Sequence, residues 1–148
     1  LYFSLMTTTR SSYVVPIPRQ DVYVLGHWLL RAVQCLVACA ELHRQYKVER
    51  PSSHATEQLA VIQHMAHMTL KAMGRLTSLE ELDDYWFEMI RLTRQAERTQ
   101  RSYRASLLDE FKAGQAIRRM DTAQQLFDAA QALGQVSSEV GRILVTES

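Results

Sequence analysis

Four cysteine and histidine side chains have spacings that could hold a metal ion. Cys39 and His43 are one helical turn apart, and His64 and His67 are three residues apart further along the chain. Thiolate and imidazole groups are zinc ligands, so two facing helices could in principle present all four to one ion. Isolated surface imidazoles on a helix are the simpler interpretation. We therefore predict no metal site and no cofactor.

Cys35 and Cys39 are the two cysteines of the 148-residue chain. Their spacing is half of the twin-cysteine motif of disulfide-bonded helical hairpins, which needs a second pair on the partner helix. The sequence has no second pair, and neighbours at this spacing on one helix have poor geometry for a direct disulfide. Both cysteines lie in the most apolar stretch, where small buried thiols are common. We predict reduced thiols in an intracellular protein.

No motif for catalysis is present. The sequence lacks the Glu-x-x-His pairs of carboxylate-bridged metal bundles, the nucleophile elbow of hydrolases and the HExxH zinc motif. Its five glycines are spread singly, so no loop could bind phosphate through successive backbone amides. The chain is therefore predicted not to be an enzyme.

A run of arginines is the most distinctive charged feature. Arg91, Arg94, Arg98 and Arg101 would occupy about a quarter of the circumference of one helix. Such a stripe could bind an acidic protein partner or nucleic-acid phosphates, or it could be a solvated face. The formal charge is only +1, from 17 basic and 16 acidic residues, which argues against a dedicated nucleic-acid binder. Protein binding through this stripe is therefore favoured, and nucleic-acid binding is the alternative.

The first predicted helix covers residues 22–49 and is apolar on nearly every side. Asp21 is the expected N-cap, and Pro51 disfavours helical backbone at the residue before it. The apolar stretch approaches the length of a membrane span. However, Arg31 lies near its centre, where a charge costs about 2.5–3.5 kcal/mol on insertion scales. We predict a buried helix of a bundle and no transmembrane span.

The second and third helices follow with clear start signals. Ser52 or Ser53 should cap a helix that ends at Met73, with Gly74 as a left-handed stop. Its predicted buried face is Leu59, Ile62, Ala66, Thr69, Met73 and Leu76. The next helix opens with a capping box formed by Ser78 and Glu81.

The end of the third helix has two possible positions between Arg101 and Gly114. An unbroken helix to Lys112 that stops at Gly114 is favoured, and a break near Ser102 or Ser106 is the alternative. The last helix follows, with a possible weakening at Gly134 or Gly141. Its predicted buried positions are Ile117, Met120, Ala123, Phe127, Ala130, Leu133, Val140 and Ile143.

These elements predict an all-α protein, an antiparallel bundle of four long helices formed by residues 21–148. Stacked helical hairpins are the runner-up, because Ala123, Phe127 and Ala130 resemble the packing positions of tetratricopeptide helices, although no 34-residue repeat recurs. Residues 1–6 resemble the remnant of a purification tag, and residues 7–20, with two prolines, should be extended.

Unequal helix lengths predict self-association. Helices of roughly 30 residues span about 45 Å, and the second helix covers only about two-thirds of that length. Tyr103, Leu107 and Phe111, together with Leu108, should then be under-covered within one chain. A two-fold homodimer would bury such a patch and is slightly favoured. The alternative is a monomer in which residues 16–20 fold back across it.

The succession of a proline-containing lead, one very apolar helix and further antiparallel helices over residues 14–145 resembles MIX, a family of kinetoplastid mitochondrial proteins. The resemblance implies a mitochondrial, membrane-associated protein whose anchor precedes this sequence and which contacts respiratory-chain components. It transfers no functional residue. Together with the long amphipathic helices, it favours a non-enzymatic protein-protein interaction or scaffold module.

Overall fold

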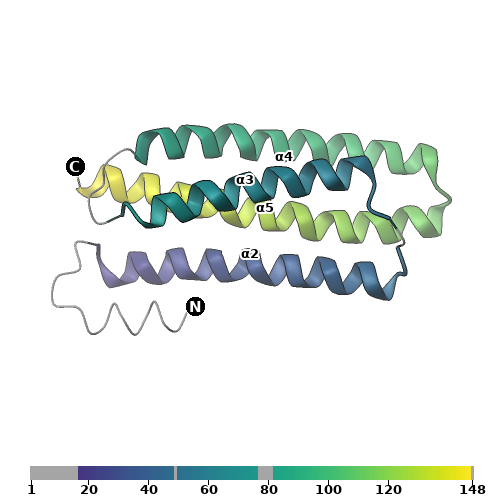
Figure 1. Ribbon diagram of the computed structural model, residues 1–148, viewed down its shortest axis with the longest axis horizontal. Helices are drawn as coiled ribbons and strands as arrows, with labels where there is room; N and C mark the ends of the chain where they lie inside the picture. Colours follow the sequence, from purple (N-terminus) through teal and green to yellow (C-terminus); the bar gives the residue numbers. More distant parts are fainter. Residues whose placement is uncertain (1–16, 49, 77–81, 148) are drawn as a thin grey trace.

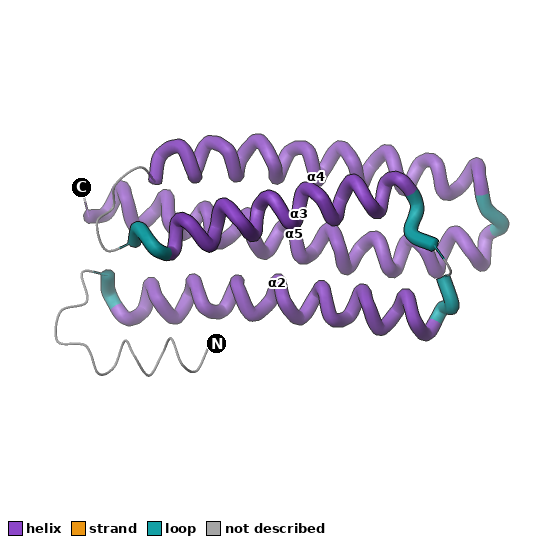
Figure 2. The backbone as a smooth tube through the Cα atoms, viewed as in Figure 1, coloured by secondary structure: helices purple, strands orange, loops and turns teal. Residues whose placement is uncertain are grey.

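The computed structural model describes residues 17–48, 50–76 and 82–147, and this part of the chain is four α-helices without a strand. The helices are α2 (Arg19–Gln45), α3 (Ser53–Met73), α4 (Leu82–Glu110) and α5 (Ala113–Glu147). They alternate in direction and lie side by side along one long axis (Figures 1 and 2). The predicted all-α antiparallel bundle is therefore confirmed.

The longest helix, α5, is the central helix of the bundle. It packs against α2, α3 and α4, and α3 and α4 also pack against each other. Among the described residues, α2 has close backbone contacts with α5 alone. Figure 1 shows α2 and α4 on opposite sides of α5, with α3 in front of it. One side of α2 therefore lacks a helical neighbour in the described structure.

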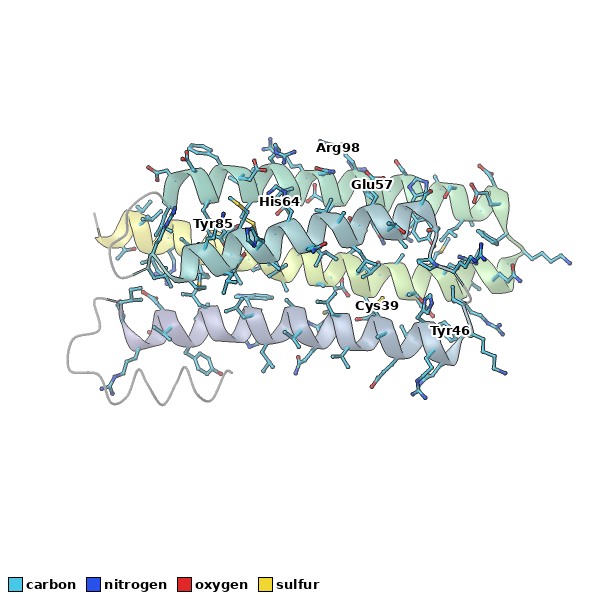
Figure 3. The ribbon with its side chains drawn as sticks, in the orientation of Figure 1. Cys39, Tyr46, Glu57, His64, Tyr85 and Arg98 are labelled. Atoms are coloured by element: carbon cyan, nitrogen blue, oxygen red, sulfur yellow. The ribbon has the colours of Figure 1, made fainter. Side chains whose placement is uncertain are left out.

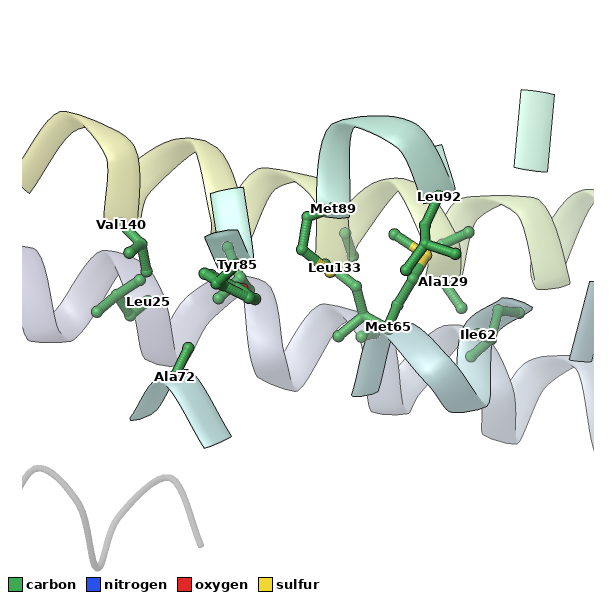
Figure 4. Close-up of a cluster of buried hydrophobic side chains, with 14 of the residues drawn as sticks. Leu25, Ile62, Met65, Ala72, Tyr85, Met89, Leu92, Ala129, Leu133 and Val140 are labelled. Atoms are coloured by element: carbon green, nitrogen blue, oxygen red, sulfur yellow. The ribbon is translucent and has the colours of Figure 1, made fainter. Parts of the chain in front are cut away.

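The main core runs through all four helices. Met65 of α3, Met89 of α4 and Val136 of α5 are fully buried, and Leu25 of α2 is nearly so. Figure 4 shows Leu25 beside Val140 of α5, and Met65 among side chains of α4 and α5. Full burial of one such side chain stabilises a fold by roughly 1.5–3 kcal/mol.

A second cluster closes the end of the bundle where α4 meets α5. Tyr103 and Leu107 of α4 are buried against Ala116 and Ala123 of α5, with Phe111 packed beside them. The prediction that Tyr103, Leu107 and Phe111 form an under-covered patch is therefore wrong. The 35 residues of α5 begin just after α4 ends, so its first turns return along the end of α4. His54 of α3 also lies against Tyr103, with 5.6 Å between the ring centres. Leu108 alone of the predicted group is exposed.

The start of α2 differs from the prediction. The helix begins at Arg19, so Arg19 and Gln20 are not extended, and Pro18 rather than Asp21 occupies the cap position. The carbonyl of Pro18 accepts hydrogen bonds from the amides of Asp21 (3.0 Å) and Val22 (3.2 Å). Its φ of −55° is already that of a helix, which is why the helix can begin directly after it. The Asp21 carboxylate instead pairs with Arg142 near the end of α5.

The end of α2 is also earlier than predicted, at Gln45 rather than residue 49. Lys47 has a φ of 53°, in the left-handed region. The amide of Val48 bonds to the carbonyl of His43 (3.1 Å), and that of Lys47 to the carbonyl of Arg44 (3.2 Å). This pair of bonds is a Schellman motif, which provides hydrogen-bond donors for carbonyls of the last turn. The helix therefore ends several residues before Pro51.

The limits of α3 agree with the prediction, but its stop does not, and its buried face agrees only in part. The Ser52 hydroxyl accepts from the Ala55 amide at 3.2 Å, as expected of an N-cap. Gly74 has a φ of −68°, so it is not the left-handed stop. Ile62 and Thr69 are buried as predicted, whereas Leu59 and Ala66 are exposed. The buried face is rotated away from Leu59 and Ala66, and its buried residues are Gln58, Val61, Ile62, Met65, Thr69 and Ala72.

The α4–α5 junction is tighter than predicted. The preferred unbroken helix is confirmed over Leu82–Glu110, but Gly114 lies inside the first turn of α5 rather than at a stop. Ile117, predicted to be buried, is exposed. Neither Gly134 nor Gly141 interrupts α5. The predicted capping box of residues 78 and 81 lies outside the described residues.

Candidate functional site

A groove of about 560 Å³ lies over α5, between α2 and α4. The two flanking helices form its walls, because both pack against α5 and not against each other. Small and amide-bearing residues of α5 form the floor. The lining residues from α2 and α4 are Trp28, Arg31, Ile90, Thr93, Arg94 and Glu97, and those from α5 include Asp128, Gln131, Gly134, Gln135 and Ser138.

Glycine at position 134 allows α4 and α5 to approach closely at the groove. A Cβ atom on Gly134 would lie 3.0 Å from Thr93 Oγ1, tighter than most real contacts. The Thr93 hydroxyl also donates to the Met89 carbonyl (2.7 Å), which holds its side chain in place. Two turns later, Gly141 leaves room for the indole ring of Trp86. The close approach of α4 to α5 therefore depends on two glycines of α5, Gly134 opposite Thr93 and Gly141 opposite Trp86.

The groove carries charges of both signs. Arg31 and Arg94 lie on opposite walls, Glu97 beside Arg94 on α4, and Asp128 on α5. In the described part of the chain none of these four side chains forms an ion pair, and Asp128 accepts one hydrogen bond, from Gln124 (2.9 Å). The site can therefore offer guanidinium donors and carboxylate acceptors to one polar ligand.

The cysteines next to this groove are poor nucleophiles. Burial raises the pKa of the Cys35 thiol, an effect that Arg31 opposes and Asp128 reinforces. Burial alone raises the pKa of the Cys39 thiol. Reactive cysteines have lowered pKa values, since the thiolate is the nucleophile. Both thiols are therefore protonated near neutral pH.

The possible zinc ligands of the sequence do not converge. Within residues 17–48, 50–76 and 82–147, no group of three or more histidine, cysteine, aspartate or glutamate side chains could hold a metal ion. Figure 3 shows Cys39 on α2 and His64 on α3, on separate helices. The structure thus does not bring Cys39 and His43 to one ion with His64 and His67.

The arginine stripe is present as an exposed face of α4. Arg91, Arg94, Arg98 and Arg101 are all exposed, and Figure 3 shows Arg98 on the outer side of that helix. Arg91 is paired with Glu88, with contacts of 2.6 and 3.0 Å that lower the pKa of the glutamate. Arg94 alone of the four also lines the groove.

The three other predicted partner-binding residues do not lie on the surface as expected. Tyr103 and Leu107 are buried, and Phe111 is partly covered, with the Arg119 guanidinium 4.3 Å from its ring centre. These residues stabilise the end of the bundle. Tyr103 and Leu107 therefore offer almost no apolar surface to a partner, and Phe111 offers only part of its ring.

Sequence reasoning missed a second exposed surface, on α2. Leu30, Val33 and Val37 are 40%, 54% and 52% exposed, and Ala40 is exposed as well. We call these four residues the outer face of α2. Their steps of three, four and three residues place them in one stripe, a signal present in the sequence. It was overlooked because the entire helix was expected to be surrounded.

By length and composition α2 could cross a membrane, and only 22% of its most apolar window is buried in the bundle. The expectation that it does not span a membrane stays a prediction. Comparison with known proteins adds no assignment: the chain matches no model of a protein family and no curated protein. The resemblance to the MIX family therefore also stays a prediction.

Proposed function

We propose that this protein is a non-enzymatic interaction or scaffold module, which binds an apolar helix of another protein along the outer face of α2. The observation that carries the proposal is the exposure of Leu30, Val33 and Val37 on a helix whose close backbone contacts with other described helices are with α5 alone. A stripe with steps of three and four residues is the pattern that packs against a second helix. A helix is therefore the partner element that fits best.

Covering the outer face of α2 would supply part of the binding free energy. Leu30, Val33 and Val37 each retain about half of their surface, so covering each would contribute on the order of 1 kcal/mol. Two arginines, Arg19 and Arg44, lie near the ends of α2 and are exposed. They can pair with acidic residues at the ends of a partner helix, which favours correct alignment.

The non-enzymatic part of the proposal is supported by the chemistry of the groove. Its charged residues lie around an open surface, and the nearest thiols, those of Cys35 and Cys39, have raised pKa values. A mitochondrial, membrane-associated role with respiratory-chain components is the part that rests on the resemblance to the MIX family.

Paired variants test the surface. Val33→Glu with Val37→Glu should abolish capture of the partner from an extract of the native source. Leu70→Glu with Leu108→Glu, which changes two exposed leucines on α3 and α4, should leave capture intact. Equal capture by both double variants would overturn the assignment of the surface. Circular dichroism of both variants should show unchanged helix content.

Light scattering of the same proteins tests the identity of the partner. We expect a mass near 17.0 kDa at micromolar concentration. A dimer mass that disappears only in Val33→Glu with Val37→Glu would identify a second copy as the occupant and overturn binding of a foreign helix. Binding of the unaltered protein to liposomes, lost in the same variant, would identify lipid instead.

Nucleic-acid binding through α4 is the second candidate. It is favoured by the exposure of Arg94, Arg98 and Arg101, which form no ion pair with another described residue. Phosphate contacts predict an affinity that falls steeply with salt, and Arg94→Glu with Arg98→Glu should abolish it. An anisotropy titration at low salt without binding excludes this candidate.

A further inference from the structure

Three polar side chains are buried where α3 meets α4. Gln58, Thr99 and Gln100 are only 3%, 6% and 6% exposed. Together with Tyr103 and with Leu126 of α5, they line a small cavity of about 10 Å³. Buried polar groups in proteins nearly always have hydrogen-bond partners, so this cluster requires an explanation.

Two atoms of the cluster lack a hydrogen-bond partner among the described residues. The Gln58 amide is oriented by its Nε2 atom, which donates to the carbonyl of Ala96 at 3.2 Å. Its Oε1 atom consequently points away from that carbonyl, is buried and accepts no hydrogen bond. The Nε2 atom of Gln100 is also buried and has no acceptor. One unmatched acceptor and one unmatched donor thus belong to residues that line the same cavity.

The third polar residue provides a further acceptor. The Thr99 hydroxyl donates its single hydrogen to Oε1 of Glu57, at 3.2 Å. Its oxygen therefore retains lone pairs but has no hydrogen left to donate. Gln58, Thr99 and Gln100 together can offer two acceptors, Gln58 Oε1 and Thr99 Oγ1, and one donor, Gln100 Nε2.

We propose that this cavity is the site of one ordered water molecule that links α3 to α4. The water donates one hydrogen to Gln58 Oε1 and the other to Thr99 Oγ1, and it accepts a hydrogen from Gln100 Nε2. Buried waters typically make about three hydrogen bonds and need a cavity of roughly 10–15 Å³. A cation fits less well, because the amide hydrogens of Gln100 would face it.

This site gives the α3–α4 interface a fixed alignment. Apolar packing alone tolerates some sliding of helices, whereas the water satisfies its partners only when Gln58 lies opposite Thr99 and Gln100. A shifted arrangement would bury the same polar atoms without a partner, which is unfavourable. The proposal is independent of the proposed partner binding at α2.

Nuclear magnetic resonance of the unaltered protein tests the site directly. In ¹⁵N-labelled protein, the side-chain amide hydrogens of Gln100 should show a cross-relaxation signal with a long-lived water. The exposed Gln63 of α3 is the control and should show no such signal. A high-resolution crystal structure should place one water within hydrogen-bond distance of Gln58 and Gln100. A direct bond between these two amides, without water, would overturn the proposal.

Thermal unfolding of three variants tests the coupling. Gln58→Met and Gln100→Met each leave the water without one partner, and each should lower the melting temperature by about 2–4 °C or more. The double variant leaves neither amide unmatched, so its loss should be smaller than the sum of the two single losses. Additive losses would show that no shared water joins the amides. Gln63→Met should have little effect.

Discussion

The buried hydroxyl of Tyr85 has a pKa that the fold shifts strongly. Thr69 donates its hydrogen to the Met65 carbonyl (2.7 Å), so the Tyr85 hydroxyl is the donor in its 3.2 Å contact with Thr69. Figure 3 shows the tyrosine at the α3–α4 interface. Burial raises its pKa to about 12.

This shift predicts a loss of stability at high pH. An unfolded tyrosine ionises near pH 10 and the folded one near 12, so the folded state holds the proton more tightly over this range. The contribution is complete below pH 10 and is lost as the pH rises through 12. It is on the order of 2–3 kcal/mol.

The variant Tyr85→Phe checks that prediction. Urea unfolding between pH 9 and pH 12 should show a smaller decrease in the free energy of unfolding for this variant than for the unaltered protein. The other groups that titrate in this range are the same in both proteins. The difference between the two curves therefore reports the ionisation of Tyr85 alone. Parallel curves would contradict the assigned pKa.

At the level of helices, Lys47, in the turn that follows α2, has a strained backbone. Lys47 has a positive φ, which favours glycine because a Cβ atom crowds the backbone there. We expect Lys47→Gly to raise the free energy of unfolding by up to about 1 kcal/mol and Lys47→Val to lower it. Lys47 is exposed, and its side chain forms no hydrogen bond or ion pair with another described residue, so thermal melts of the two variants isolate the backbone effect.

Two glycines of α5 should respond to alanine in opposite ways. Gly114 has nothing within 4 Å of an added Cβ atom, so Gly114→Ala should stabilise the helix by up to about 1 kcal/mol. At Gly141 the added atom would lie 2.7 Å from Trp86 Nε1, so the indole ring must move. Gly141→Ala should therefore lower the melting temperature and shift the tryptophan fluorescence. Equal stabilisation by both substitutions would contradict the close packing at Trp86.

The sequence was informative about elements and much less so about their faces. Hydrophobic periodicity and the Ser52 cap identified the helices, because these signals are local. The Schellman turn at Lys47 was missed, since lysine carries no signal for a left-handed backbone. Leu107 and Leu30 were assigned to the wrong environments, because burial depends on which neighbour each helix meets. The groove was not predicted for the same reason. A charged residue within an apolar helix, Arg31, was the sequence signal for it, since Arg31 lines the groove.

For the whole molecule, α2 has close backbone contacts with only one other described helix, α5, and we therefore expect structure to be lost stepwise. Helices α3, α4 and α5 each pack against the other two, so they can remain folded when α2 separates. Polar contacts between α2 and α5 include the pair of Asp21 with Arg142 and the bond from the Tyr46 hydroxyl to Asp121 (3.0 Å), near the two ends of α2. Figure 3 shows Tyr46 at the carboxyl end of α2.

Native-state hydrogen exchange should reveal α2 as the least protected cooperative unit. Its slowest amides should exchange through an opening of lower free energy than those of α4 and α5. Arg142→Met with Tyr46→Phe should accelerate exchange in α2 and leave the centre of α4 unchanged. A single opening free energy for all four helices would contradict this behaviour. A partner bound to the outer face of α2 would slow exchange in the segment that opens first. The exchange rate of the α2 amides would therefore measure the fraction of the protein that has a partner bound.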